Sequence, residues 1–349
     1  MKKFPKPKLK DRLPPVSTIV LNWNGIKYLK KCLLALERVN YPASRHEIIM
    51  VDNGSTDDSV SYVKKSFKNV KIIETGKNLG FAEGNNVGVR AAKHDHVMML
   101  SNDTEVDRNW LLEAVKKCES GKNIAVVGAH IYNTGDYYHK EESIGTLLNL
   151  WGFPISTREK GLTFLAPGCS LLFKKSVIGE PFDRDYFIYS EDTYLSWKAL
   201  VQGREVVIAE KSVLEHVGST KIKEVPDLIE FHGEKNRVLN LLLFYEPLTL
   251  LKVTPLIFIT SLMTILAAIP KGRLLIRLKS YLWLFANMDK IIEKRRKIQK
   301  SRRVPDSQLM GRMSSRLPYS KGLVKRLAEL ITKLYCVLAR LPVHELRRK

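Results

Sequence analysis

Two residues far apart in the sequence, Asp103 and His216, carry side chains that can bind a divalent cation. Asp103 follows the apolar run at residues 96–100, and its carboxylate could hold a hard cation together with phosphate oxygens. A neutral imidazole at His216 could complete a manganese or magnesium site. Each residue also has a plainer reading, because Asp103 could cap the helix expected near Asn109 and a single His is usually structural or exposed. Together they predict a Mn²⁺ or Mg²⁺ site that also takes phosphate.

Two adjacent carboxylates, Glu191 and Asp192, stand at the start of a predicted helix. One of them could act as a general base while the other positions it. The aromatic residues at 186–189 just before them could exclude water from the reacting centre. The alternative is that both acids only stabilise the amino end of the helix through its dipole.

Asp52 and Trp23 are the residues best suited to hold a nucleobase. Asp52 could accept hydrogen bonds from the N–H of a uracil- or thymine-type base, and Trp23 could stack on the ring. An Asp before Asn53 and Gly54 is also a common turn residue, and a Trp is as often part of a core.

The elements that must position these side chains alternate between short apolar runs and amphipathic stretches. Strands are expected at residues 17–22, 46–52, 70–74, 96–100 and 124–128, with helices at 26–37, 57–67, 81–92 and 109–118. This alternation predicts an α/β fold with a mostly parallel sheet and helices on both faces.

Ligands of such sheets bind at the carboxyl ends of the strands, and polar residues gather there. The four groups are Asn22-Trp23-Asn24-Gly25, Asp52-Asn53-Gly54-Ser55, Gly76 with Asn78-Leu79-Gly80, and Ser101-Asn102-Asp103-Thr104. Any one group could be an ordinary turn, but their recurrence on one edge predicts a binding site. Further along, we expect a buried strand at 168–174, a loop and helix at 183–203, and short strands at 205–209 and 212–216.

The formal net charge of +22 is concentrated at the two ends of the chain. Residues 246–349 carry 23 Lys and Arg against 6 Asp and Glu, and residues 1–12 are also basic. We therefore expect three regions: a basic tail at 1–12, a catalytic core at 13–245, and a basic helical region at 246–349. A basic tail can bind nucleic acid or an anionic membrane, and the apolar content of this one favours the membrane.

The helical region contains an uncharged segment at residues 253–269, flanked by Lys252 and Lys271. At 17 residues it is borderline for crossing a bilayer, so it could cross or lie in one leaflet. Leucines at helical spacing between 323 and 341, with basic residues among them, predict an amphipathic helix on an anionic membrane. The excess of Lys and Arg favours the cytoplasmic face of the cell membrane. A soluble helical appendage is the alternative.

Two further observations fit a cytosol-facing protein. The four cysteines show neither zinc-site nor redox spacing, which suits a reducing compartment. The first residues carry charge but no apolar run before Pro14, so no secretory signal is expected there.

Over residues 16–237, the chain resembles the family-two inverting glycosyltransferases with the GT-A fold, and in particular their rhamnosyltransferase-like branch. The motifs that carry the resemblance are IVLNWNG, VDNGSTDDS, NLGFAEGNNVGVRAA, LSNDTEVD, FDRDYFIYSEDTYLSWKA and LEHVGS, in this order.

The resemblance implies a role for each matching residue. Asp103 and His216 would bind the metal, and Asp192 would be the general base with Glu191 as its neighbour. The residues expected to bind the nucleotide sugar are Asn22, Trp23, Asp52, Asn53, Gly80, Phe81, Asn85, Asn86 and Asn102. The implied reaction is a single displacement, with inversion, from a nucleoside diphosphate sugar to a saccharide or lipid-linked saccharide acceptor.

The chain departs from the family pattern at three positions. Ser101 replaces the first acid of the DxD metal motif, a position where this branch often has Asn. Tyr194 replaces a frequent second acid, and Lys198 replaces a common Arg on the same helix. The last two fall toward the acceptor side.

Two other function classes stay open. A sugar-nucleotide binder without activity is allowed by Ser101. A nucleic-acid-binding protein is suggested by the charge, but it is disfavoured because the charge avoids the core and no known module appears. The sugar, the acceptor linkage, the metal and the oligomeric state are not determined by the sequence.

Overall fold

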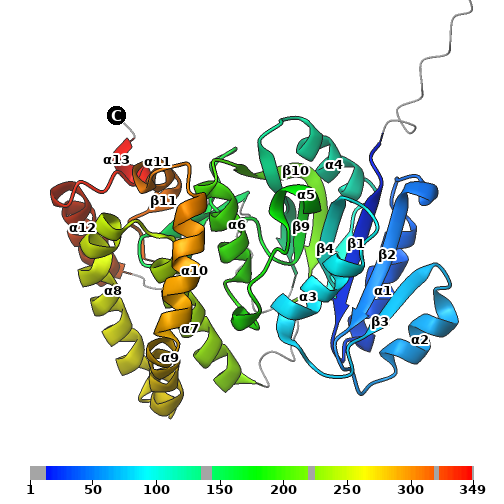
Figure 1. The fold of residues 1–349 in the computed structure, drawn as a ribbon, viewed down its shortest axis with the longest axis horizontal. Helices are drawn as coiled ribbons and strands as arrows, with labels where there is room; N and C mark the ends of the chain where they lie inside the picture. Colours follow the sequence, from blue (N-terminus) through cyan, green and yellow to red (C-terminus); the bar gives the residue numbers. More distant parts are fainter. Residues whose placement is uncertain (1–12, 135–143, 219–224, 318–321, 348–349) are drawn as a thin grey trace, which may run out of the picture. The chain divides into compact units, whose positions relative to one another are not determined.

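The computed structural model describes residues 13–134, 144–218, 225–317 and 322–347, and these form two compact units. The sheet unit comprises residues 1–142, 167–181 and 208–218, and the helical unit comprises 143–166, 182–207 and 219–349. Each is described by itself (Figure 1). The predicted basic tail at 1–12 lies outside the described residues.

The sheet unit is built on an eight-stranded sheet in the order β3-β2-β1-β4-β9-β6-β10-β5. Its strands are β1 Val16–Asn22, β2 His46–Asp52, β3 Val70–Glu74, β4 His96–Ser101, β5 Thr104–Val106, β6 Ile124–Asn133, β9 Ser170–Lys174 and β10 Glu205–His216, of which residues 205–207 are counted in the helical unit. Its helices are α1 Ile26–Glu37, α2 Ser59–Ser66, α3 Gly80–Ala91, α4 Trp110–Glu119 and α5 Lys175–Ile178, with a short 3-10 turn at Ala43–Arg45.

The sheet is parallel from β3 to β4, as the sequence predicts, and antiparallel where β9 joins it. β1 pairs in parallel with both β2 and β4, whereas β9 runs antiparallel to β4 and to β6, and β5 runs antiparallel to β10. In the parallel half Asn22 pairs with Asp52, and Leu21 with Ser101. The polar groups that follow these strands therefore share one edge of the sheet.

The helices cover this sheet because their apolar residues recur on one side. α1 buries Leu29, Cys32, Leu33 and Leu36 at helical spacing. The connection from β3 to β4 runs back across β2 and β1, so a right-handed crossover places α3 on the face opposite α1 and α2. In agreement, α3 packs on β1 and β2 while α1 contacts α2.

The helical unit contains a small sheet in the order β11-β7-β8 and most of the remaining helices. The strands are β7 Gly145–Asn149, β8 Pro154–Thr157 and β11 Met313–Ser314. The helices are α6 Glu191–Val201, α7 Pro226–Phe244, α8 Pro247–Ala268, α9 Leu274–Ala286, α10 Met288–Ser301, α11 Asp306–Leu309, α12 Gly322–Leu338 and α13 His344–Arg347, with 3-10 turns at Arg184–Tyr186 and Met310–Arg312. Trp197 forms the centre of an aromatic core, stacked on Phe244 and edge-on to Tyr245 and Phe164.

Candidate functional site

Asp103 and His216 meet at the edge of the sheet unit. Asp103 lies in the tight turn between β4 and β5, and β5 pairs antiparallel with β10 so that Thr104 faces His216. The backbone N–H of Val217 donates to the carbonyl of Asp103 at 3.0 Å, which fixes the end of this pairing. As a result the Nε2 of His216 lies 3.4 Å from Oδ1 of Asp103.

The geometry of this pair fits two ligands of one cation. Ligand atoms about 2.1 Å from a Mg²⁺-sized ion at right angles lie roughly 3 Å apart. The observed 3.4 Å is close to that spacing and longer than a good N–H···O hydrogen bond. The two side chains are only 7% and 12% exposed, so a cation between them would lose part of its hydration and favour phosphate oxygens as further ligands. A carboxylate and an imidazole are suitable donors for Mn²⁺.

Another group of possible metal ligands in the described residues is His96, Cys118 and Glu119. Lys174 already lies 2.7 Å from the Glu119 carboxylate, and His96 lies 2.8 Å from the same oxygen. Burial raises the pKa of Cys118 to about 11, so its thiol keeps its proton at neutral pH. We therefore interpret this cluster as an ion-paired structural group and not as a metal site.

Asp52, the predicted base-binding residue, is buried at the end of β2. Its Oδ2 accepts a hydrogen bond from the Ser55 N–H at 3.0 Å, and its Oδ1 accepts from the Asn22 side chain at 3.2 Å. Asp52 therefore does stabilise its own turn, as the alternative interpretation of this residue predicts. Each carboxylate oxygen can accept more than one hydrogen bond, so the carboxylate keeps acceptor capacity for a ligand.

Asn22 and Asn102 join the ends of β1 and β4, the point where the strand order of the sheet reverses. The Asn102 amide donates to Oδ1 of Asn22 at 2.6 Å. Gly25 makes this approach possible, because a Cβ there would lie 1.9 Å from the Asn102 nitrogen. Two predicted nucleotide-binding residues therefore belong to one hydrogen-bonded cluster with Asp52.

Trp23, next to Asn22, is 38% exposed. A core role is therefore excluded, and its ring is available for stacking.

Asn53 organises the loop before α3. Its side chain donates to the carbonyl of Gly80 at 3.0 Å and accepts from the N–H of Leu79 at 2.9 Å. Gly54 adopts a φ of +76°, and a Cβ at this position would lie 2.5 Å from the backbone of Lys77. The Asp52–Gly54 turn and the Gly80 loop therefore depend on each other.

Phe81, Asn85 and Asn86 lie on α3 just after this loop. Asn85 and Asn86 are buried, and their amides donate to the carbonyl of Phe81 at 2.9 Å and to Glu83 at 3.2 Å. These contacts stabilise the first turns of α3. A direct contact of the three side chains with a nucleotide stays a prediction.

Glu191 and Asp192 begin α6 in the helical unit, as the sequence predicts. Glu191 is 7% exposed, and its Oε2 has no hydrogen-bond partner among the described residues. Burial, together with the charge of Asp192, raises the pKa of Glu191 to about 8. Asp192 is less buried, and its Oδ1 accepts from the N–H of Thr193 at 2.7 Å. At neutral pH Glu191 therefore holds a proton.

The loop before α6 has an unusual backbone. Phe187, Tyr189 and Ser190 have φ values of 58°, 69° and 59°, a region that non-glycine residues rarely adopt. Strain of this kind persists where the surrounding structure holds it, and it concentrates at functional sites.

Two asparagines of α7 hold this loop. The Asn236 amide donates to the carbonyls of Tyr186, Ile188 and Tyr189 at 2.7–2.8 Å. Asn240 accepts from the Tyr186 hydroxyl at 2.6 Å and donates to the carbonyl of Ser190 at 3.1 Å. Neither residue was among the predicted site residues. Asn236 belongs to a polar run at residues 232–237, inside a helix whose following turns are buried, and that run was the available signal.

Comparisons with known proteins find similar sequences and folds. Residues 17–180 match the family model of glycosyl transferase family 2. The glycosyltransferase AglE of Haloferax volcanii is 28% identical over 122 residues, which cover 34% of this chain and 40% of AglE. The poly-beta-1,6-N-acetyl-D-glucosamine synthase of Staphylococcus aureus is 26% identical over 202 residues, covering 56% of this chain and 48% of the synthase. The chain thus spans less than half the length of these relatives.

Solved structures share the fold at low sequence identity. The mannosyltransferase PcManGT from Pyrobaculum calidifontis, in complex with GDP-Man and Mn²⁺, superposes with a TM-score of 0.53 at 16% identity, covering 97% of this chain and 89% of that one. TarS 1–349 of S. aureus, in complex with UDP, gives 0.52 at 15% identity, covering 95% and 90%. The predicted GT-A fold is confirmed, with a mixed sheet. Residues 17–180 of the chain form a glycosyl transferase family 2 domain.

Proposed function

We propose that the chain is an inverting glycosyltransferase that moves a sugar from a nucleoside diphosphate to an acceptor hydroxyl. The observation that carries this proposal is the approach of Asp103 and His216 to 3.4 Å, on the same sheet edge as the Asn22–Asp52–Asn102 cluster. Structural neighbours described with nucleotides and Mn²⁺ support it.

In this proposal the donor is held by residues of the sheet unit. Asp52 accepts hydrogen bonds from the base, Trp23 stacks on it, and Asn22 and Asn102 fix the edge of the pocket. Asp103 and His216 would hold a divalent cation, which neutralises the charge of the diphosphate leaving group when bound. Asp192 takes the proton of the acceptor hydroxyl. Neutral Glu191 beside it avoids a second negative charge at the start of α6.

We further propose that the acceptor is a saccharide carried on a membrane lipid and that the protein associates with the cytoplasmic membrane face. α8 is long and apolar enough to cross a bilayer, and it supports membrane association by length and composition alone. Rhamnose remains the sugar that the sequence resemblance suggests.

The proposal is tested by a thermal-stability screen of nucleotide sugars with and without Mn²⁺. A donor that binds raises the unfolding temperature in proportion to its occupancy. We expect one or a few donors to stabilise the protein, and to do so more strongly with Mn²⁺.

The stabilising donor is then used to measure transfer and hydrolysis by wild type, Asp192→Asn and the control Asp289→Asn. Asp289 is an exposed carboxylate on α10. We expect Asp192→Asn to retain donor binding and lose turnover, and the control to keep both. Donor binding without turnover in the wild type would show an inactive sugar-nucleotide binder instead.

A further inference from the structure

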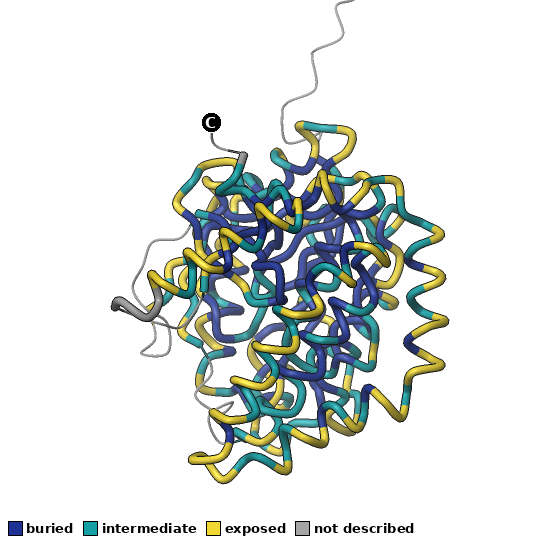
Figure 2. Tube along the Cα trace, turned by 90° about the vertical axis from the view of Figure 1, so that its left-hand side faces the viewer, coloured by how far each residue is buried: buried dark blue, intermediate teal, exposed yellow. Residues whose placement is uncertain are grey.

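Exposed apolar side chains are concentrated in the helical unit. Among the described residues, 20 of the 23 large apolar side chains that are exposed lie between Leu248 and Leu338. Figure 2 marks the exposed positions along the chain. Soluble monomers rarely expose contiguous apolar patches of this kind, so the surface indicates a binding partner.

Three helices, α8, α9 and α12, carry most of these side chains, and α8 contacts both of the others. α8 packs against α9, and the hydroxyl of Tyr335 on α12 donates to the carbonyl of Lys252 on α8 at 2.5 Å. The exposed residues recur every three to four positions on each helix, which places them in stripes. On α8 they are Leu248, Leu251, Phe258, Ile259, Leu262, Met263 and Leu266. On α9 they are Leu275, Leu278, Leu282 and Phe285, and on α12 they are Leu327, Leu330, Ile331, Leu334, Val337 and Leu338.

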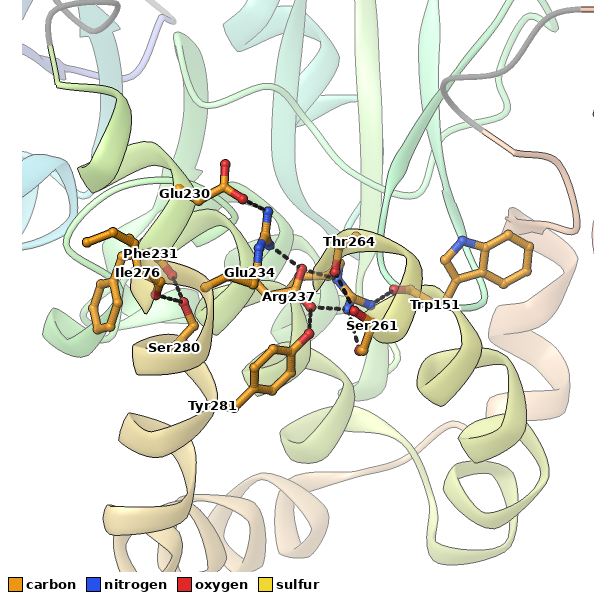
Figure 3. A network of polar contacts seen from close by, with 11 residues as sticks. Trp151, Glu230, Phe231, Glu234, Arg237, Ser261, Thr264, Ile276, Ser280 and Tyr281 are labelled. Carbon is orange, nitrogen blue, oxygen red and sulfur yellow. Dashed lines mark hydrogen bonds and ion pairs between the residues drawn. The ribbon is translucent and has the colours of Figure 1, made fainter. Parts of the chain in front are cut away.

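The opposite side of α8 is attached to a buried network of charges (Figure 3). Arg237 on α7, which is 2% exposed, donates to the hydroxyl of Ser261 in α8 at 3.0 Å and to Glu234 at 2.5 Å. Arg277 on α9 donates to Glu234 at 2.8 Å and also bonds Glu230. Burial acts to raise the pKa of Glu234, but Arg237 and Arg277 outweigh this and hold it below its ordinary value. The network is therefore ionic at neutral pH.

This network restricts the orientation that α8 can take in a bilayer. A helix of 22 residues is about 33 Å long, close to the roughly 30 Å of a hydrocarbon core. If α8 crossed the membrane, Ser261 and the charges bonded beside it would lie inside the hydrocarbon. Ionised groups are strongly disfavoured there. Only the outer stripe of α8 is suited to lipid.

The charge of these helices favours an anionic partner. Exposed basic residues lie beside the stripes, on the same helices or next to their ends: Lys271, Lys279, Arg326, Lys333 and Arg340. Basic side chains beside apolar stripes are the pattern of helices that lie on anionic lipid. A second copy of this chain would bring the same positive charge and repel it.

We propose that the outer stripes of α8, α9 and α12 form a docking surface for one leaflet of an anionic lipid bilayer, in which α8 lies along the membrane plane instead of crossing it. This deepens the membrane association proposed above and is independent of the sugar chemistry.

The surface is tested with the full chain and sealed vesicles of phosphatidylcholine, with or without phosphatidylglycerol. Phe258→Glu, Phe285→Glu and Leu334→Glu each place a charge on one stripe, and Ser66→Glu places one at an exposed site on α2 of the sheet unit. We expect the wild type and Ser66→Glu to sediment with the anionic vesicles. Each stripe variant should partition about tenfold or more weakly, since a large apolar side chain no longer enters the lipid.

Two outcomes would overturn the docking surface. One is unchanged vesicle binding by all three stripe variants. The other is that the wild type does not bind vesicles and is a dimer by light scattering, while the stripe variants are monomers. Donor hydrolysis is measured on the same samples without lipid, so a failed membrane surface and a failed glycosyltransferase assignment give different results.

The orientation of α8 is tested by cysteine labelling in sealed inside-out membrane vesicles from producing cells. Pro247→Cys and Lys271→Cys place thiols at exposed positions at the two ends of α8. An impermeant maleimide should label both from the outside, above the background of the wild type. Labelling of only one until detergent opens the vesicles would show a crossing helix and contradict the in-plane arrangement.

Discussion

The Nε2 of His216 lies 3.4 Å from Oδ1 of Asp103, although the two residues are far apart in the sequence. The short antiparallel pair of β5 and β10 creates this approach, and both side chains are largely shielded from water. A buried carboxylate and imidazole at this spacing can share a divalent cation.

We expect Asp103→Ala and His216→Ala each to weaken Mn²⁺ binding by at least about 100-fold, because each removes one of the two proposed protein ligands. Even changes to residues behind a metal ligand weaken binding by about 10–100-fold. Isothermal titration with Mn²⁺ and a nucleoside diphosphate measures this. His94→Ala, in a turn of the same unit, is the control and should bind as the wild type does. Unchanged Mn²⁺ affinity in both site variants would remove the metal assignment.

For Asp52→Asn, we expect donor affinity to fall by about 10–100-fold, the value of one or two hydrogen bonds to a charged acceptor. Donors with a uracil or thymine base should lose most, because their ring N–H would lose its charged acceptor. Competition by UDP against a purine diphosphate measures the difference. Asp58→Asn, an exposed acid nearby, should leave both affinities unchanged.

The raised pKa of Glu191 predicts that the free energy of unfolding falls as the pH rises. Its pKa is about 8 in the folded chain, against an ordinary value of 4.5 for a glutamate exposed to water, so between these values the unfolded chain has released the proton while the folded chain still binds it. The slope of unfolding free energy against pH is therefore negative in this window, with a total of at most about 5 kcal/mol. Glu191→Gln should abolish this part of the slope. Denaturant unfolding of both proteins from pH 5 to pH 8 compares them, and parallel curves would contradict the prediction.

Asn236→Ala should loosen the strained loop before α6. Loss of its two amide hydrogens leaves carbonyls of that loop unpaired, and we expect unfolding to become easier by about 2–3 kcal/mol. Turnover should fall more than donor affinity, because the loop leads directly to Glu191 and Asp192. The matched change Asn287→Ala removes one local hydrogen bond, from the Asn287 amide to the carbonyl of Trp283. It should lower stability less than Asn236→Ala and change turnover little. If Asn236→Ala and the control Asn287→Ala had equal turnover, the loop would have a structural role only.

The parallel half of the sheet was predictable because β1, β2 and β4 contain buried apolar runs and each parallel strand ends in a turn. The bounds of β2 and β3 are those expected from the sequence, and β1 differs by one residue. The polar clusters after these strands were predictable for the same reason, since parallel strands end on one edge.

The antiparallel half was harder to predict. β5 has only three residues, Thr104–Val106, in a polar stretch that reads as a turn. It is a strand only because β10 pairs with it. The two short strands expected at 205–209 and 212–216 form the single strand β10, since pairing continues past the polar Glu210 and Lys211. Tertiary pairing, not local sequence, decides both cases.

The contacts that hold Glu191 and Asp192 could not be read from the sequence. Asn236 and Asn240 act on a loop about 50 residues earlier in the chain, and nothing local shows which carbonyls they reach. The same holds for Arg237 and Ser261, which join α7 to the apolar helix α8. From its sequence, α8 is a candidate membrane-spanning helix. Only the contact of Ser261 with the buried Arg237 distinguishes one side of this helix from the other.

The alignment of β10 on β5 has a consequence for how this protein tolerates change. Side chains of a strand alternate between faces, so removal of one residue between Ser212 and His216 would turn the imidazole away from Asp103 while leaving most of the sheet intact. Such a chain would fold and keep its hydrophobic interior and the Asn22–Asp52–Asn102 cluster, yet Asp103 and His216 would no longer meet. Short deletions here would therefore separate folding from chemistry more cleanly than changes anywhere in the apolar interior.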